Sequence, residues 1–185
     1  TTEIYTLSLH DALPISEAVV NELHQKIAEQ SAAVSSEDLI QLVSFNIGDE
    51  EFGVDITKVK EINRMVEITR VPNTPDFVVG VINLRGKVIP IINLRHRLGM
   101  ILIENDKNTR IVVIEHDNKT IGFIVDNVNE VLRISRNITE PPPQMSGNVD
   151  SQFITSIGKL EDRLLILLDL EKIIEKGSQL ELTEN

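Results

Sequence analysis

The chain contains no cysteine and no tryptophan, and aromatic residues make up only 3% of its 185 residues. The absence of cysteine excludes disulfide bonds, thiolate zinc sites and cysteine nucleophiles, and it fits a reducing compartment. No apolar run reaches the roughly eighteen residues that a membrane-spanning helix needs. We therefore expect a protein without thiol chemistry and without direct insertion into a membrane.

Basic charge is also scarce. Lys and Arg total 18 against 29 Asp and Glu, which gives a formal net charge of -11 at pH 7. Proteins that bind a phosphate backbone rely on clustered basic side chains, and those that bind single strands add exposed aromatic rings. An oligonucleotide-binding β-barrel would need both features, so we expect no nucleic-acid partner.

Motifs for catalysis and metal binding are missing as well. His96 and His116 lie far apart in the sequence and share no ligand spacing with a carboxylate. Gly80 and Gly86 do not form a phosphate-binding loop, and no serine lies in a nucleophile elbow. The acidic turn at residues 49–51 lacks the alternating oxygen ligands of a calcium loop. We therefore expect no cofactor, no metal site and no enzymatic activity.

Short runs of Val, Ile and Leu dominate what is present. Runs bounded by turn residues predict strands at 39–47, 51–54, 67–71, 111–115, 120–125, 128–134, 153–160 and 164–168. Short helices are expected at 56–61 after an Asp55 N-cap, at 94–98 before Gly99, and at 171–176. Because no crossover helix of ordinary length lies between strands, the pattern favours a mainly β sandwich or barrels over a βαβ fold.

The stretch from Gly80 to Gly99 is the most informative. Two apolar runs, 81–84 and 88–92, flank Arg85-Gly-Lys87 and predict a β-hairpin, and the tripeptide Asn-Leu-Arg occurs twice, at 83–85 and 93–95. Arg85 would lie at the rim of the hairpin. There it can contact a partner or form an internal salt bridge, and the residues alone leave both alternatives open. With no nucleophile, base or metal cluster beside it, the segment points to a binding module.

The two ends of the chain depart from the β pattern. Residues 1–15, TTEIYTLSLHDALPI, match one reading frame of a common sequencing-library adaptor, so we expect a non-native segment that contributes nothing to the fold. A signal peptide fits poorly, because a basic first region and a long apolar run are absent. Residues 16–38 predict an N-terminal extension, helical or disordered, outside the core. Residues 39–176 form the expected domain, and residues 177–185 form a polar tail.

Several motifs, in order, resemble the CheW family of bacterial chemotaxis coupling proteins. They are Phe45-Asn-Ile-Gly-Asp-Glu-Glu-Phe-Gly-Val-Asp-Ile56, Val59-Lys-Glu-Ile62, Arg70-Val-Pro-Asn-Thr-Pro75, the two Asn-Leu-Arg segments, Ile121-Gly-Phe-Ile-Val-Asp126 and Leu164-Leu-Ile-Leu-Leu-Asp169. Ordered motifs are together more specific than any one alone. The resemblance covers residues 39–176 and implies two small five-stranded β-barrels around a shared hydrophobic core, with short helices.

The resemblance also implies a function. A family member is a non-catalytic adaptor that couples chemoreceptor (methyl-accepting chemotaxis protein) tips to the regulatory domain of the histidine kinase CheA, in cytoplasmic arrays at the membrane. The partner-binding residues carried over by motif are Glu61, Ile62, Gly80, Arg85, Gly122 and Val128. The two charged residues would supply selectivity, Ile62 and Val128 apolar area, and the glycines close approach of a partner helix. The alternative is a regulatory domain detached from a larger CheA- or CheV-type protein.

Overall fold

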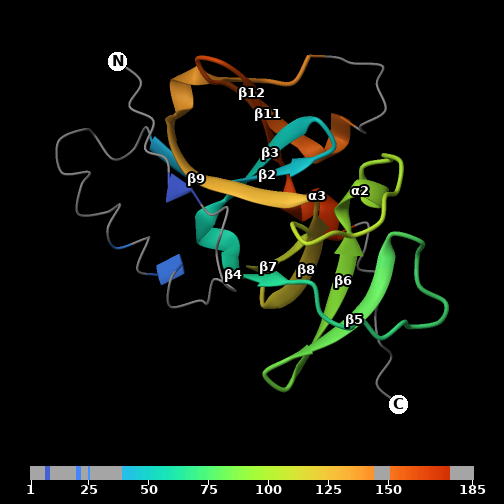
Figure 1. Ribbon diagram of the computed structural model, residues 1–185. Coiled ribbons are helices and arrows are strands. Elements are labelled where there is room, and N and C mark those ends of the chain that lie inside the picture. Colours follow the sequence, from blue (N-terminus) through green and yellow to red (C-terminus); the bar gives the residue numbers. More distant parts are fainter. Residues whose placement is uncertain (1–6, 9–19, 22–24, 26–38, 144–150, 176–185) are drawn as a thin grey trace.

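Two β-sheets form most of the structure (Figure 1). The computed structural model describes residues 7–8, 20–21, 25, 39–143 and 151–175. The seven-stranded sheet has the strand order β1-β9-β2-β3-β12-β11-β10, and its strands are β1 (Leu7–Ser8), β2 (Leu39–Ile47), β3 (Glu50–Asp55), β9 (Asn127–Ser135), β10 (Thr139–Glu140), β11 (Ile154–Lys159) and β12 (Leu164–Leu168). The five-stranded sheet has the order β4-β7-β8-β6-β5, and its strands are β4 (Val59–Arg64), β5 (Val78–Leu84), β6 (Lys87–Asn93), β7 (Arg110–His116) and β8 (Lys119–Val125). The expected mainly β fold is confirmed.

Short helices join or flank these strands. They are η2 (Ile56–Lys58), α2 (Leu94–Arg97), η3 (Arg136–Ile138), η4 (Ser151–Phe153) and α3 (Leu170–Glu175). The chain passes from the seven-stranded to the five-stranded sheet through η2 and returns where β8 leads into β9, so the smaller sheet is inserted within the larger one. No helix in the described part of the chain combines the length and apolar character that crossing a membrane would require.

Many strands bury side chains on both faces, which explains their nearly continuous apolar sequences. On β7, Val112 and Ile114 face a core that both sheets share, whereas Ile111 and Val113 face a core within the five-stranded sheet. A third cluster, which includes Leu132, lies within the seven-stranded sheet. The expected shared hydrophobic core is therefore present, and each sheet adds a smaller core of its own.

Each sheet curls, but no ladder joins its two outer strands among the residues that the structure describes. In the larger sheet, β9 is second in the strand order and β10 is last, yet only η3 separates them in the sequence. The sheet therefore curls so that its two ends approach each other. In the smaller sheet the segment after β4 reaches β5, where Thr69 and Val81 exchange backbone hydrogen bonds of 2.8 and 2.9 Å. The expected barrels are thus curled sheets that are not fully closed, and the two-residue strands β1 and β10 extend the larger one beyond five strands.

Local predictions are confirmed where turn chemistry is strong. The hairpin formed by β5 and β6, the helical turn before Gly99 and the terminal helix occur close to their expected places. The helix predicted for 56–61 is wrong beyond Lys58, because Val59 pairs with Ile114 and begins β4. The strand predicted for 67–71 contributes only the single bridge at Thr69.

Two segments that we expected to lie outside the fold contribute to it. Leu7–Ser8 pairs with the outer edge of β9, because an edge strand offers backbone groups that any extended chain can bond. Val20 is buried in the shared core, so the expectation that residues 16–38 stay outside the core is wrong at this position. Residues 1–6, 9–19, 22–24 and 26–38, together with residues 144–150 and 176–185, lie outside the described residues.

Candidate protein-interaction site

The Arg85 side chain pairs with a buried carboxylate. Arg85 and Gly86 form the two-residue turn between β5 and β6 with φ values of 50° and 84°, as a tight hairpin turn of this kind requires. The Arg85 Nη2 donates a hydrogen bond to Glu61 Oε2 at 2.6 Å. The Glu61 side chain is 5% exposed and that of Arg85 is 60% exposed. The internal salt bridge therefore exists, and most of the guanidinium still faces solvent.

This ion pair links the two outer strands of the five-stranded sheet. Glu61 lies on β4, and Arg85 directly follows β5. Removing the cation would leave an unpaired charge in a buried position, which costs far more than losing a surface salt bridge. The pair therefore bridges the two outer strands and holds the guanidinium at the hairpin tip.

Ile62 and the two candidate glycines are packed against the chain itself. Ile62 is buried in the shared core. A Cβ at Gly80, where φ is +153°, would lie 2.2 Å from the Thr69 carbonyl oxygen, and a Cβ at Gly122 would lie 2.5 Å from Cδ1 of Ile91. Internal packing thus requires glycine at position 80, whereas a side chain at position 122 would have to displace the ends of the Ile91 and Ile111 side chains. Contact of these three residues with a partner helix stays a prediction.

Val128 lies on the other sheet. It is buried on β9 and lines a hollow of about 410 Å³ together with Ile103, Asp126 and other residues near the junction of the two sheets. The structure therefore brings Glu61 and Arg85 into direct contact, keeps Ile62 beside Glu61 on β4, and places Val128 apart on the seven-stranded sheet. Its contact with a partner also stays a prediction.

Sequence reasoning misses the role of Arg95. Its guanidinium pairs with Asp126, whose Oδ2 also accepts a hydrogen bond from the Gly48 N–H at 2.7 Å. The Arg95 Nη1 donates to the Ile101 carbonyl at 3.0 Å. These contacts fasten α2 to the β2–β3 turn and to the β8–β9 connection. The repeated Asn-Leu-Arg tripeptide was the available signal, since Arg85 and Arg95 are both its third residue and both pair with a carboxylate.

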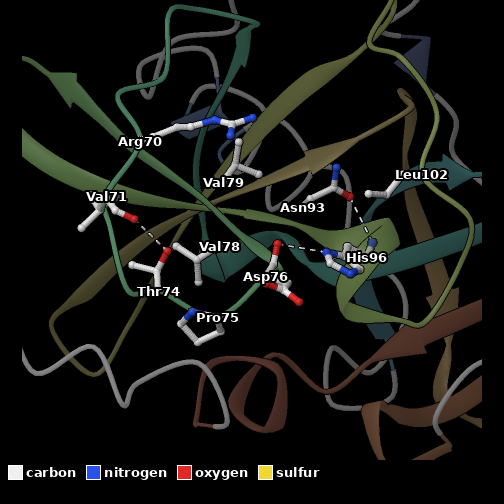
Figure 2. A pocket seen from close by; sticks show the side chains of 10 residues that line it. All are labelled: Arg70, Val71, Thr74, Pro75, Asp76, Val78, Val79, Asn93, His96 and Leu102. Carbon is white, nitrogen blue, oxygen red and sulfur yellow. Dashed lines mark hydrogen bonds between the residues drawn. The ribbon is translucent and has the colours of Figure 1, made fainter.

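The two histidines of the domain make separate local contacts. His96 borders a hollow of about 370 Å³ beside α2, and its Nδ1 lies 3.0 Å from the Asp76 carbonyl oxygen (Figure 2). His116 Nε2 lies 3.3 Å and 3.4 Å from the carboxylates of Asp117 and Glu171. In the described ranges, no group of three or more metal-ligating side chains is arranged to hold a metal ion.

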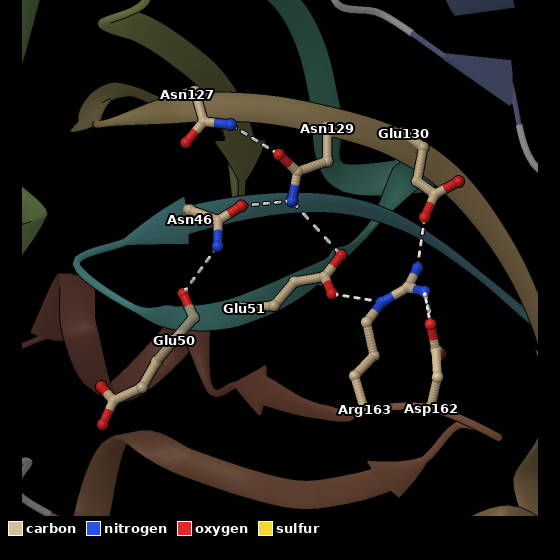
Figure 3. Close-up of polar contacts among 8 residues, drawn as sticks. All are labelled: Asn46, Glu50, Glu51, Asn127, Asn129, Glu130, Asp162 and Arg163. Carbon is tan, nitrogen blue, oxygen red and sulfur yellow. Dashed lines mark hydrogen bonds and ion pairs between the residues drawn. The ribbon is translucent and has the colours of Figure 1, made fainter.

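A polar network lies over β3 and β9 (Figure 3). Arg163, in the turn before β12, pairs with Glu51, Glu130 and the adjacent Asp162, and Asn129 donates a hydrogen bond to Glu51 at 3.3 Å. Burial alone would lower the pKa of Arg163, but the hydrogen bond and the negative charges, chiefly of Glu51, raise it above its usual value. The network ties the β11–β12 turn to the neighbouring strands, which is a structural role.

Comparison with known proteins identifies the family. The profile of the CheW-like domain matches residues 41–178. The chemotaxis protein CheW of Klebsiella aerogenes is 37% identical over 145 residues, 78% of this chain and 87% of that protein. The chemotaxis protein CheW of Helicobacter pylori is 36% identical over 160 residues, 85% of this chain and 96% of that protein. The crystal structure of the scaffolding protein TtCheW from Thermoanaerobacter tengcongensis has a TM-score of 0.70 and 39% identity, and the match covers 74% of this chain and 92% of that one. Because the profile spans well over half of the sequence, the chain belongs to the CheW-like domain family.

Proposed function

We propose that this protein is a non-catalytic scaffold that couples chemoreceptor tips to the histidine kinase CheA. The observation that carries the proposal is the family match over residues 41–178, together with relatives that are chemotaxis and scaffolding proteins. The protein would act in the cytoplasm, at arrays of membrane-bound receptors, and would need no cofactor. The family match also supports a role without catalysis.

Arg85 is the residue best placed to contact a receptor tip. Its guanidinium has several N–H donors, one of which is directed to Glu61, and its side chain is largely exposed. An acidic side chain on a receptor helix can bind the remaining donors in a planar, paired geometry. Because Glu61 already holds the guanidinium in place, less conformational entropy is lost on binding.

The other candidate residues would shape the receptor surface rather than supply most of its contacts. Ile62, Gly80 and Gly122 set the spacing and curl of strands that carry the hairpin. Val128 would add apolar area at the edge of the hollow that it lines. Substitutions at these positions should therefore act on binding mainly through the backbone.

The kinase would bind a different part of the scaffold. We propose that the CheA regulatory domain docks sheet against sheet, and that repeated contacts of this kind assemble the array. Each single contact can be weak, because linked contacts raise the overall avidity. The alternative is that the domain belongs to a larger CheA- or CheV-type protein. The receptor and kinase surfaces would then be the same, and this alternative also stays a prediction.

Charge reversal at the hairpin tip tests the proposal. The variant Arg85→Glu should bind a receptor-tip fragment about tenfold more weakly, because it replaces an exposed cation at the proposed contact. Binding to the CheA regulatory domain should change by less than about twofold, since that contact lies elsewhere. Both affinities are measured by biolayer interferometry. The matched control is Lys87→Glu, which makes the same charge change two positions along the hairpin.

A second variant, Glu61→Gln combined with Arg85→Glu, avoids placing two carboxylates together and keeps the test valid if the single variant unfolds. Unchanged receptor binding by a folded Arg85→Glu protein would remove Arg85 from the site. Failure of the unmodified protein to bind either the receptor fragment or the kinase domain would overturn the function itself.

A further inference from the structure

The loop after α2 exposes three consecutive large apolar side chains. Ile101, Leu102 and Ile103 are 84%, 53% and 55% exposed. The other exposed large apolar residues in the described part of the chain occur singly in the sequence. Adjacent apolar side chains left in solvent are a feature of interaction surfaces, whereas single ones are ordinary.

Both flanks of this loop are well bonded, so the exposure is built into the fold. Before it, the Met100 N–H donates to the Arg95 carbonyl at 2.9 Å, and Arg95 Nη1 donates to the Ile101 carbonyl. The Met100 side chain packs against the shared core. After it, Asp106 Oδ1 accepts a hydrogen bond from the Asn108 N–H at 2.7 Å. The flanks therefore hold the apolar residues outward.

The backbone between these flanks is open. Residues 102–105 contain no helix, strand, turn or bend, and in the described structure no hydrogen bond is recorded for their N–H and C=O groups. Leu102 borders the hollow beside His96, whereas the next residue, Ile103, borders the hollow beside Val128. The segment thus presents both free backbone groups and apolar side chains to a second strand.

The charges around the loop restrict the partner. Glu104 and Asp106 are exposed, and Lys107 is an exposed cation just beyond them, whereas Arg110 directs its Nη1 to the backbone carbonyls of residues 107 and 109. A second copy of a chain with a net charge of -11 would bring like charges together. A neutral or basic partner is therefore favoured over self-association.

We propose that residues 101–105 are a docking strand for an extended segment of a partner protein in which apolar residues alternate with Lys or Arg. The partner backbone pairs with the N–H and C=O groups of every second residue in 102–105, since successive residues of a strand direct these groups to opposite edges. Side chains alternate along an extended strand, so Ile101 and Ile103 share one face while Glu104 and Asp106 share the other. Apolar and basic side chains of the partner match these two faces. This surface is separate from Arg85 and does not depend on the proposed function.

The test uses a synthetic peptide, acetyl-Lys-Val-Lys-Val-Lys-Val-Lys-amide, titrated into the full ¹⁵N-labelled chain and followed by NMR. We expect shift changes centred on the amides of residues 102–105, slower exchange of every second amide among them, and binding that weakens as salt is added. The double variant Ile101→Ser/Ile103→Ser should bind about tenfold more weakly. The matched control, Leu164→Ser, removes an exposed leucine elsewhere and should leave binding unchanged.

Two further peptides separate the contribution of charge from that of backbone hydrogen bonds. Replacing each Lys by Glu should abolish binding through repulsion, and N-methylation of the valines should weaken it by removing backbone donors. Absence of binding by the Lys-Val peptide overturns the proposal, as does binding that the double variant leaves intact. Shifts centred on the edge of β9 would assign the peptide to that edge and overturn it too. Sedimentation velocity tests whether a second copy of the chain occupies this strand instead. Self-association that is lost in the double variant would identify that second copy as the partner and would overturn the proposal.

Discussion

At the residue scale, the two Asn-Leu-Arg segments use the same hydrogen bond in different elements. The Asn83 side chain accepts from the Gly86 N–H at 2.9 Å in the hairpin turn. The Asn93 side chain accepts from the His96 N–H at 3.1 Å at the start of α2. In both segments the donor is the backbone N–H three residues after the asparagine, so each asparagine satisfies the N–H at the equivalent position. The following residues, not the asparagine, decide between turn and helix.

The arginine of each segment then pairs with a carboxylate from a distant part of the chain. Arg85 binds Glu61 and Arg95 binds Asp126. The sequence indicates that Arg85 lies at a rim, but it does not give the partner. Glu61 is 24 residues away and on the opposite outer strand of the sheet, so only the curl of the sheet brings the two side chains together.

Arg163 carries the first stability prediction. Its substitution by Met removes the cation that Glu51 and Glu130 share, and both of these carboxylates are mostly buried. We expect a loss of about 2 kcal/mol in the free energy of unfolding, because the two acids are left without a partner. Urea denaturation measures it. Adding Glu51→Gln should recover part of the loss, and Lys159→Met, which breaks an exposed pair, should change stability by less than about 0.5 kcal/mol. Equal losses in Arg163→Met and Lys159→Met would contradict the network's role.

At the element scale, β-pairing overrides local helix signals. Asp55 is an effective cap, since its Oδ1 accepts from the Thr57 N–H at 2.9 Å, and the first helical turn forms as predicted. Val59 then enters a ladder with β7 and ends that turn. A cap specifies only where a helix begins, whereas its length depends on tertiary partners that the local sequence does not show.

The start of α3 gives a pH prediction. Asp169 Oδ1 accepts from the Lys172 N–H at 3.2 Å. Burial favours a higher pKa for Asp169, but the hydrogen bonds and charge of Lys172 outweigh it and hold the pKa below its usual value. A lowered pKa in the folded state means that the ionised carboxylate stabilises the fold. This contribution is complete above the unfolded pKa and is lost as pH falls through the folded value.

Asp169→Ala should therefore cost about 1 kcal/mol at pH 7 through loss of the cap and the charge. Its deficit against the unmodified protein should shrink as the pH falls below about 4. Asp169→Asn should keep the helix-capping hydrogen bond but lose the pH-dependent part of the contribution that Asp169 makes to the free energy of unfolding. Urea denaturation at several pH values measures both, with Asp49→Asn in an exposed turn as the control. A deficit that does not change with pH would show that the ionised form is not favoured.

At the scale of the whole molecule, the shared core makes the two sheets one folding unit. Strands of both sheets bury side chains in it, including Phe45 from β2 and Ile114 from β7. Neither sheet can lose this contact without exposing apolar surface on the other. The two chain crossings, through η2 and between β8 and β9, reinforce the connection.

A cavity in the shared core tests this cooperativity. Ile114→Ala should lower the free energy of unfolding by about 3 kcal/mol. The most protected amides of β2 and β7 should lose the same amount of protection in hydrogen exchange, because both exchange through global unfolding. Loss of protection confined to the five-stranded sheet would show that the sheets unfold separately.

The sequence by itself determined the fold class, the positions of most strands and the resemblance to the family. These follow from local patterns: alternating or continuous apolar runs, turn residues and ordered motifs. Tertiary structure alone decided that Glu61 is buried and paired with Arg85, that Gly80 and Gly122 are held by internal contacts, and that the backbone of residues 102–105 stays open. Each of these depends on how strongly the sheets curl and which distant segments meet. Such contacts join residues far apart in the chain, and no local pattern encodes them.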